Sequence, residues 1–352
     1  MRHPVTLIPG DGIGPEVAAS TREVLEATGI AFEWDEQAAG AGVLDAEGSV
    51  LPDRVLDSIR RTGVALKGPI TTPIGTGFRS ANVALRQGLD LFAAVRPARS
   101  TPGVETPYPD VDLVIVRENT EDLYAGIEFE AGTDQAAALR EEVARLRGVA
   151  LREDAGVTLK PISVTGARRI ARFAFEHARA TGRGRVTLGH KASVLRLSDG
   201  LLLEVATAEA AAHPDVAFEA VEIDDLAMRL VVEPAAFDVL LLPNLYGDIL
   251  SDLAAGLVGG LGLAAGANLG WEHAVFEPVH GSAPDIAGTG VADPIAMIRS
   301  GAMLLRHVGE PAAADAVDGA VDRMLREGRV RPRDLGGTAT TAAVTAAVVA
   351  AL

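Results

Sequence analysis

Short apolar runs that read as buried strands alternate with helical segments along almost the whole chain. The predicted strands cover residues 5–8, 31–35, 64–67, 89–95, 111–116, 157–163, 186–189, 217–223 and 237–243. The predicted helices cover residues 16–28, 53–61, 135–147, 166–181, 201–212, 294–307 and 312–327, with a terminal helix after Thr338. This alternation predicts an α/β protein. Because 352 residues suffice for two domains and no linker or repeat separates them, we expect the domains to be interleaved.

Charge and composition exclude several kinds of partner and chemistry. The formal net charge of −16 should repel nucleic acid and anionic membranes. Without cysteine, the chain forms no disulfide, thiolate nucleophile or Cys–zinc site. There is no signal-like segment and no run of 18 apolar residues, so we expect a cytoplasmic protein with no membrane partner.

Two carboxylates lie one turn apart at the start of the helix that follows the strand at 237–243. Asp248 and Asp252 are at positions i and i+4 and share a face, with no Lys or Arg beside them in the sequence. Hard divalent cations such as Mg²⁺ or Mn²⁺ are bound by oxygen ligands of this kind. The alternative is a solvated acidic helix start. Asp224, after the strand at 217–223, is a candidate third carboxylate.

Three arginines lie at or near the ends of predicted elements. Arg96 and Arg117 follow the strands at 89–95 and 111–116, and Arg86 lies one turn into the helix after the Gly-, Pro- and Thr-rich stretch 68–82. Each could be a solvated or ion-paired surface residue. Together they indicate a ligand with several carboxylates or a phosphate, which guanidinium groups bind through paired hydrogen bonds. Ser80 or Asn82 can cap the helix that carries Arg86.

Further segments carry candidate chemistry. Lys191 follows a buried strand, so burial could lower its pKa for proton transfer, or the lysine could be solvated. Tyr124 follows Arg117 closely and could be an aromatic at the edge of the core.

The glycines of 9–15 have G-x-G-x-G spacing rather than that of a Rossmann site, which leaves a tight turn or a close approach to a ligand. The charged helix 135–147 should lie outside the core, 256–270 permits close packing or a hinge, and 277–288 reads as a loop.

In this order along the chain, the motifs resemble the isocitrate/3-isopropylmalate dehydrogenase family of β-decarboxylating dehydrogenases. The residues that carry the resemblance are Thr71-Thr72-Pro73, Arg86, Arg96, Arg117-Glu118-Asn119-Thr120-Glu121, Tyr124, Lys191, Asp224, Asn244-Leu245-Tyr246-Gly247-Asp248 and His280-Gly281-Ser282-Ala283-Pro284. The resemblance implies a non-Rossmann α/β fold with two domains around a central cleft. Residues 1–98 and 255–352 would form the large domain and 99–254 the small one, with a dimerisation clasp at about 125–163. It also implies a homodimer with shared active sites, in which the partner chain supplies Lys191 and Asp224.

The resemblance further implies an enzyme that converts isocitrate to 2-oxoglutarate and CO₂ with NAD and Mg²⁺ or Mn²⁺. Lys191 would help remove the hydroxyl proton and Tyr124 would protonate the enol carbon. Arg86, Arg96 and Arg117 would bind substrate carboxylates, and Ser80 and Asn82 would reach the third one. Asp224, Asp248 and Asp252 would hold the metal, which would stabilise the enolate formed as CO₂ leaves.

For the cofactor, the resemblance implies binding residues at Ile13, Thr71, His280, Gly281, Ala283, Asp285, Ile286 and Asp293. NADP-using relatives carry Lys-Tyr where this chain has Asp285-Ile286, and Asp285 would repel a 2′-phosphate. Glu233, near the partner segment that approaches the same phosphate, adds negative charge. These features predict NAD.

Three positions depart from the family pattern: Ser193, Asp225 and Asp293 stand where relatives usually carry Asn. Homoisocitrate, 3-isopropylmalate and other C3-substituted malates remain alternative substrates, because one methylene changes binding by only about 1–3 kcal/mol. A non-enzymatic regulatory homologue is the alternative from another class.

Overall fold

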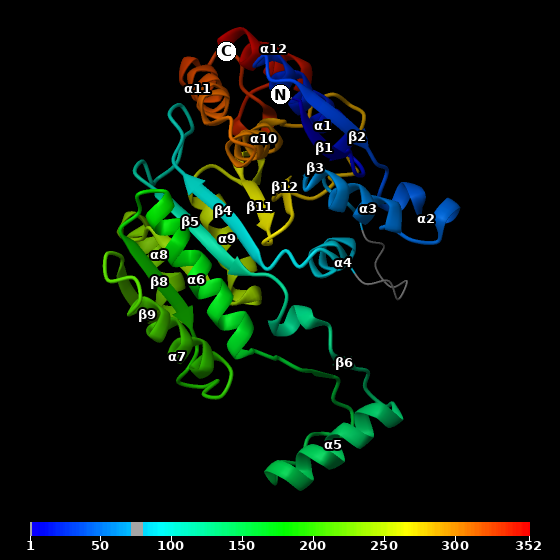
Figure 1. The fold of residues 1–352 in the computed structure, drawn as a ribbon, viewed down its shortest axis with the longest axis vertical. Helices are drawn as coiled ribbons and strands as arrows, with labels where there is room; N and C mark the ends of the chain where they lie inside the picture. Colours follow the sequence, from blue (N-terminus) through cyan, green and yellow to red (C-terminus); the bar gives the residue numbers. More distant parts are fainter. Residues whose placement is uncertain (1, 72–79) are drawn as a thin grey trace.

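The computed structural model describes residues 2–71 and 80–352. Thr72 and Pro73 of the motifs discussed above lie outside the described residues. Ten strands form one sheet in the order β2-β1-β3-β12-β11-β4-β5-β10-β8-β9 (Figure 1). The strands are β1 (His3–Ile8), β2 (Phe32–Glu36), β3 (Val64–Lys67), β4 (Ala93–Arg99), β5 (Asp112–Glu118), β8 (Arg185–His190), β9 (Ala217–Glu222), β10 (Val239–Leu242), β11 (Ala265–Leu269) and β12 (Ala274–Pro278).

The direction of the strands changes in the middle of the sheet. Strands β2, β1, β3 and β12 are parallel to one another, as are β5, β10, β8 and β9. Between these two groups, β12–β11, β11–β4 and β4–β5 pair antiparallel. Fully buried strands such as β3 and β10 are apolar throughout or nearly so, as expected for strands covered on both faces.

Helices cover the sheet in two groups. Helices α1 (Gly14–Ala27), α10 (Ile295–His307), α11 (Pro311–Glu327) and α12 (Thr341–Ala351) pack together, so both chain ends lie in one region (Figure 1). The other half carries α6 (Val164–Ala180), α7 (Asp199–Ala210), α8 (Ile223–Val232) and α9 (Asn244–Leu257). Shorter helices are α2 (Ala41–Glu47), α3 (Asp53–Thr62) and α4 (Ala81–Gly88), and 3₁₀ turns are η1 (Asp122–Ala125), η2 (Pro234–Ala236), η3 (Leu261–Leu263) and η4 (Arg333–Leu335).

The buried core divides along the chain in the same way. Two hydrophobic clusters take their buried residues from 5–91 and 263–348, and the other two take theirs from 92–258. One sheet nevertheless runs through both halves. The predicted domain boundaries at residues 98 and 254 therefore stay a prediction that the core clusters favour.

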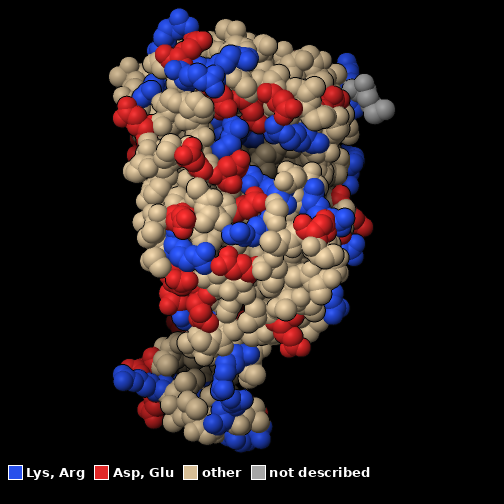
Figure 2. Space-filling model, turned by 90° about the vertical axis from the view of Figure 1, so that its left-hand side faces the viewer, with Lys and Arg blue, Asp and Glu red and all other residues tan. Residues whose placement is uncertain are grey.

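An arm extends away from the body. It consists of the two-stranded sheet β6 (Glu128–Phe129) and β7 (Val157–Thr158) and helix α5 (Asp134–Arg147) (Figures 1 and 2). Ala136 is the buried residue of α5, so this charged helix lies outside the core, as predicted. On the face in Figure 2, acidic and basic side chains are interspersed despite the negative net charge. None of the described helices is long and apolar enough to cross a membrane.

Three predicted segments differ in the structure. The strand expected at 157–163 is β7 alone, because α6 begins at Val164 after Ser163 caps it by accepting a hydrogen bond from the Gly166 backbone. The strand expected at 89–95 is β4, which begins only at Ala93, so Arg96 lies inside the strand rather than after it. The predicted loop 277–288 begins later than expected, since Glu277 belongs to β12.

Candidate active site

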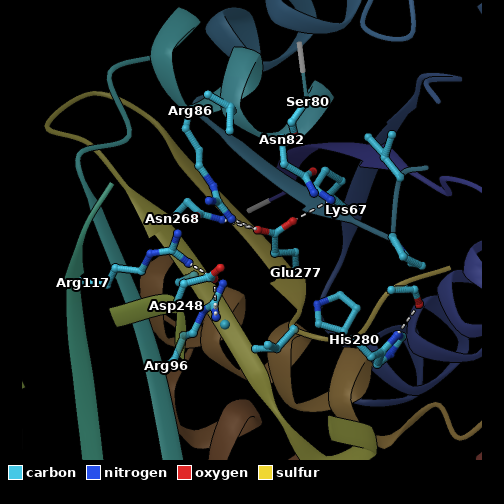
Figure 3. A pocket seen from close by; sticks show the side chains of 18 of the residues that line it. Lys67, Ser80, Asn82, Arg86, Arg96, Arg117, Asp248, Asn268, Glu277 and His280 are labelled. Carbon is cyan, nitrogen blue, oxygen red and sulfur yellow. Dashed lines mark hydrogen bonds and ion pairs between the residues drawn. The ribbon is translucent and has the colours of Figure 1, made fainter. Parts of the chain in front are cut away.

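A pocket of about 240 Å³ opens where α4, β4, β5, η1, α9 and the β11–β12 hairpin meet (Figure 3). The residues predicted for substrate binding, Ser80, Asn82, Arg86, Arg96 and Arg117, all line it. Tyr124, Asp248, His280 and Gly281 line it as well. Sheet order explains the convergence, because β4 and β5 are neighbours and α9 packs against both.

The three arginines give the pocket a concentration of positive charge. Arg117 is fully buried and Arg86 is 7% exposed. Burial, together with the charges of Arg96 and Arg86, lowers the pKa of Arg117 to about 10. Burial and the charge of Arg86 also lower the pKa of Arg96. Because these guanidinium groups destabilise one another, an anion with several negative charges would be bound strongly here.

Asp248 and Tyr124 are held together beside Arg117. The Arg117 Nη1 and the Tyr124 hydroxyl both donate to the Asp248 carboxylate. Asn244 Oδ1, at the start of α9, accepts from Arg117 Nε at 3.0 Å and Nη2 at 2.6 Å. Gly247 allows this close packing, since an added Cβ would lie 2.5 Å from Arg117 Cγ. Burial alone would raise the pKa of Asp248, but the Arg117 charge and the Tyr124 hydrogen bond keep it below its ordinary value.

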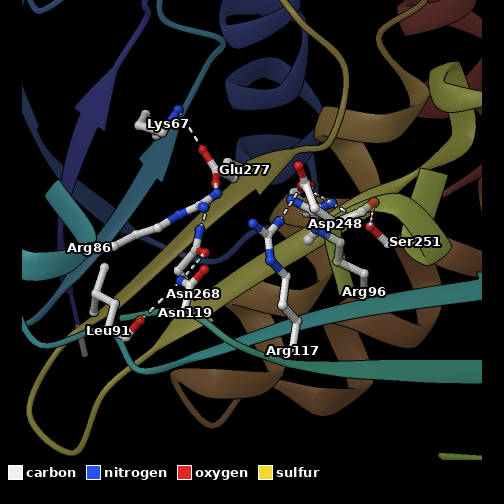
Figure 4. Close-up of polar contacts among 12 residues, drawn as sticks. Lys67, Arg86, Leu91, Arg96, Arg117, Asn119, Asp248, Ser251, Asn268 and Glu277 are labelled. Carbon is white, nitrogen blue, oxygen red and sulfur yellow. Dashed lines mark hydrogen bonds and ion pairs between the residues drawn. The ribbon is translucent and has the colours of Figure 1, made fainter. Parts of the chain in front are cut away.

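Lys67, Asn268 and Glu277 form a buried group that the motif analysis missed (Figures 3 and 4). Lys67 Nζ lies 2.5 Å from Glu277 Oε2, and Arg86 Nη2 lies 3.3 Å from Oε1. Asn268 Nδ2 donates to Glu277 Oε1 at 2.6 Å. Burial would raise the pKa of Glu277, but Lys67 and Arg86 lower it to about 2. The sequence signal that could have found it is a lysine at the end of a buried strand, as Lys67 is in β3.

The carboxylate oxygens of Asp248 and Asp252 are ligands of the kind that divalent cations prefer. They lie one turn apart on α9, and Arg96 Nη1 is 3.7 Å from Asp252 Oδ1 and 3.6 Å from Asp248 Oδ1. Burial and the negative charge of Asp248 raise the pKa of Asp252 despite Arg96, which is the repulsion that a cation would relieve. Within residues 2–71 and 80–352 of one chain, no group of three His, Cys, Asp or Glu side chains could hold a metal ion.

Lys191 and Asp224 lie apart from the described pocket lining. Lys191 Nζ is 2.5 Å from Asp224 Oδ1 and 3.0 Å from Glu222 Oε2. These hydrogen bonds raise the pKa of Lys191, so the prediction of a pKa lowered by burial is wrong for the single chain. Ser193 Oγ donates to Glu222 Oε2 at 2.8 Å, and Asp225 is exposed at the start of α8.

The residues predicted for the cofactor gather around the loop after β12. The Ile13 backbone N–H donates to Ser282 O at 2.9 Å, and the hydroxyls of Thr71 and Ser282 lie 2.6 Å apart. Gly12, at φ +61°, lets the chain approach Ser282. Ala283 and Ile286 pack on the core, whereas Asp285 is exposed.

Asp293 precedes the N-cap residue of α10, and its half-buried side chain lies beside a second carboxylate. Its Oδ1 accepts from the Ile295 N–H at 2.9 Å. Burial and the charge of Asp334 raise the pKa of Asp293 well above its ordinary value. This environment favours the neutral form of the Asp that takes the place of the expected Asn. Glu233 is exposed at the end of α8.

Fold and site together define an α/β protein with a pocket that brings three arginine side chains together. The family model for isocitrate/isopropylmalate dehydrogenase matches residues 4–351. The chain is 45% identical over 344 residues to isocitrate dehydrogenase [NAD] catalytic subunit 5, mitochondrial, of Arabidopsis thaliana, covering 97% of this chain and 87% of the relative. It is 44% identical to the chloroplastic 3-isopropylmalate dehydrogenase of Solanum tuberosum, covering 92% and 86%.

Among solved structures, the isocitrate dehydrogenase of Methylococcus capsulatus has a TM-score of 0.92 and 47% identity, covering 99% of both chains. The chain belongs to the isocitrate/isopropylmalate dehydrogenase family. The predicted family, fold class and assignment as a dehydrogenase are thereby confirmed.

Proposed function

We propose that the protein oxidises and decarboxylates isocitrate to 2-oxoglutarate and CO₂ with NAD. The observation that carries the proposal is the lining of the pocket. It contains three guanidinium groups and the polar side chains of Ser80 and Asn82. Ser80 is at the cap position of α4 but makes no side-chain cap hydrogen bond, and the buried Asn82 Oδ1 has no partner among the described residues. The Ser80 hydroxyl and the Asn82 amide nitrogen are hydrogen-bond donors from which a third carboxylate would accept, and an isopropyl group would leave them unpaired.

The chemistry assigns a role to each side chain. Arg86, Arg96 and Arg117 would orient the substrate through its carboxylates, so that hydride leaves C2 for the nicotinamide. Lys191, from the partner chain in this proposal, would help remove the proton of the C2 hydroxyl. Once the C3 carboxylate has left as CO₂, Tyr124 would donate a proton to C3 of the enol.

A divalent cation, held by Asp248, Asp252 and a partner-chain Asp224, would supply a positive charge that favours the alkoxide and enolate forms of the substrate. We also propose that the protein is a homodimer and that its domains divide at residues 98 and 254. The separation of Lys191 from the described pocket lining and the split of the core clusters support them. The cytoplasmic location and the lack of nucleic-acid partners remain predictions from composition.

NAD is favoured over NADP because the loop after β12 offers no cation at the predicted positions. Asp285 is exposed there and Ile286 packs on the core. A 2′-phosphate placed beside Asp285 would be repelled and would lack a charged donor.

Substrate choice gives the direct test of the proposed function. Isocitrate, homoisocitrate, 3-isopropylmalate, D-malate and tartrate are assayed side by side with NAD and with NADP. We expect isocitrate with NAD to have the highest kcat/KM. The double variant Ser80→Ala/Asn82→Ala should lower the kcat/KM for isocitrate by about tenfold or more. A better substrate among the other four, or an unchanged kcat/KM in that variant, would contradict the reading of Ser80 and Asn82. A higher kcat/KM with NADP would contradict the cofactor assignment.

Asp252→Asn should weaken cation binding and spare the fold. Asp252 is half-exposed and its contact with Arg96 is long, at 3.7 Å, so little stability depends on it. We expect the Mn²⁺ concentration for half-maximal activity to rise by about tenfold or more, with Tm changed by about 2 °C or less. Calorimetric titration with Mn²⁺ provides a readout besides activity. An unchanged Mn²⁺ dependence would remove Asp252 from the metal site.

A further inference from the structure

Lysine is rare in this chain. Of its 32 Lys and Arg residues, three are lysines: Lys67, Lys160 and Lys191. Lys67 lines the pocket and Lys191 carries a proposed catalytic role, whereas Lys160 has none so far. It lies between β7 and α6, where the arm rejoins the body. Because arginine supplies the cation almost everywhere else, charge alone does not account for a lysine at this position.

Lys160 lies between two fully buried carboxylates. Its Nζ is 2.5 Å from Asp199 Oδ1 and 3.7 Å from Asp122 Oδ1, and 4.6 Å from the centre of the Tyr246 ring. The Lys160 side chain is 14% exposed, and both aspartates are 0% exposed. Burial would lower the pKa of Lys160, but the hydrogen bond to Asp199 and the charge of Asp122 raise it, so the ammonium stays charged. A compact ammonium suits a space enclosed by two carboxylates and a ring face.

Asp122 fixes the segments that carry Tyr124 and Asp248. Its Oδ1 accepts from the Leu123 N–H at 2.8 Å in η1, and its Oδ2 accepts from the Leu245 N–H at 2.9 Å in the first turn of α9. Helix α9 has no side-chain cap from its own N-cap residue, Pro243, so Asp122 serves as its cap. The Asp122 backbone itself has φ +66°, a conformation that needs support from its surroundings.

Asp199 fixes the segment that carries Lys191. Its Oδ2 accepts from the Lys191 N–H at 2.8 Å, while its Oδ1 faces Lys160. One ammonium therefore contacts both carboxylates that hold the two proposed proton-transfer residues in place. Lys160 is not among the described residues that line the pocket.

We propose that Lys160 is a positioning residue that, through Asp122 and Asp199, holds the backbones of Tyr124 and Lys191. The inference rests on the proposed function for the roles of those two residues. In a dimer with shared sites, each Lys160 would support the tyrosine of its own site and the lysine that its chain lends to the other site. The arm would thus be joined to both sites at its base.

The test compares Lys160→Met and Lys160→Arg with the matched control Arg172→Met. Arg172 is an exposed cation on α6 paired with Glu176 at 2.7 Å. In full-length protein, we expect Lys160→Met to lower kcat by about tenfold or more while the KM values change by less than about threefold. Lys160→Arg should lower kcat by about threefold or more, since a planar guanidinium does not fit the place of the ammonium. The control should stay within about twofold.

Amide hydrogen exchange supplies a readout that needs no turnover. In Lys160→Met, exchange at Leu245 and Lys191 should accelerate by about tenfold or more, with amides of α1 unchanged. Unchanged exchange at both amides, kcat within twofold in both variants, or a KM rise that matches the kcat loss would each overturn the proposal. Failure of both variants to fold would assign Lys160 to stability alone and would also overturn it. If the wild type oxidises none of the assayed substrates, the proposed function fails and the exchange result alone decides the positioning role.

Discussion

Mixing inactive Tyr124→Phe chains with inactive Lys191→Met chains is expected to restore about a quarter of the wild-type activity. Each variant alone should lose about 10²–10⁴-fold in kcat, because each lacks a proposed proton-transfer group. If the partner chain supplies Lys191, a mixed dimer has one site with both substitutions and one site with neither. Random pairing makes about half of the dimers mixed, each with one intact site. The physical basis is that Lys191 lies outside the described pocket lining of its own chain, paired with Asp224.

The measurement is NAD reduction after the two variants are unfolded together and refolded, or expressed together. Two controls decide the interpretation: each variant refolded alone should stay inactive, and Tyr124→Phe mixed with Tyr124→Phe/Lys191→Met should recover nothing. Recovery absent from the first mixture, with mixed dimers verified by mass, would contradict shared sites and the proposed homodimer arrangement.

Glu277→Gln is expected to destabilise the protein by about 3 kcal/mol at neutral pH, because it leaves the buried Lys67 ammonium without its carboxylate. Lys67 is 1% exposed and its Nζ lies 2.5 Å from Glu277 Oε2. The pKa of Glu277 falls from 4.5 to about 2 in the folded chain, and a shift of this size corresponds to about 3 kcal/mol. The matched control is Asp57→Asn, which breaks an exposed pair with Arg60 and should cost less than about 1 kcal/mol.

The pH dependence of this effect has a definite sign. Since the folded pKa of Glu277 is lower than its ordinary value, the stabilisation is complete above about pH 4.5 and is lost as the pH falls toward 2. The difference in unfolding free energy between wild type and Glu277→Gln should therefore shrink over that window. Urea unfolding at pH 7, 4.5 and 3.5 measures it. A difference that is constant across these pH values, or smaller than that of Asp57→Asn, would contradict the account of the ion pair.

Local sequence patterns predicted most helices and strands and part of the candidate site. Periodicity placed Asp248 and Asp252 on one face of a helix, and α9 has that geometry. The arginines were singled out by their positions near element ends, although Arg96 lies within β4 rather than after it. Leu91 and Phe92 misled that prediction, because they are apolar and buried but precede the first residue of the strand.

The missed group shows why a pattern of residue types is insufficient. Glu277 follows Phe276 and precedes proline and glycine residues that favour turns, so the sequence predicts the start of a loop there. In the structure it is a buried strand residue, because Lys67 and Arg86 reach it from parts of the chain about 200 residues away. A charged side chain can be buried when an oppositely charged side chain lies beside it in the fold. The sequence alone does not show which side chain that is.

The sequence by itself determined the α/β class, the acidic pair on α9, the exposed arm helix α5 and the membership of the family, since local periodicity and ordered motifs carry these. Tertiary structure alone decided which charges meet. Strands β3, β5 and β12 and helix α9 come from distant parts of the chain, and their packing sets Arg117 against Asp248 and Lys67 against Glu277. The tertiary structure also pairs Lys191 with Asp224, which raises the pKa of Lys191 instead of lowering it. The physical reason is that burial and charge pairing depend on neighbours in space, whereas helix and strand patterns depend on neighbours in sequence.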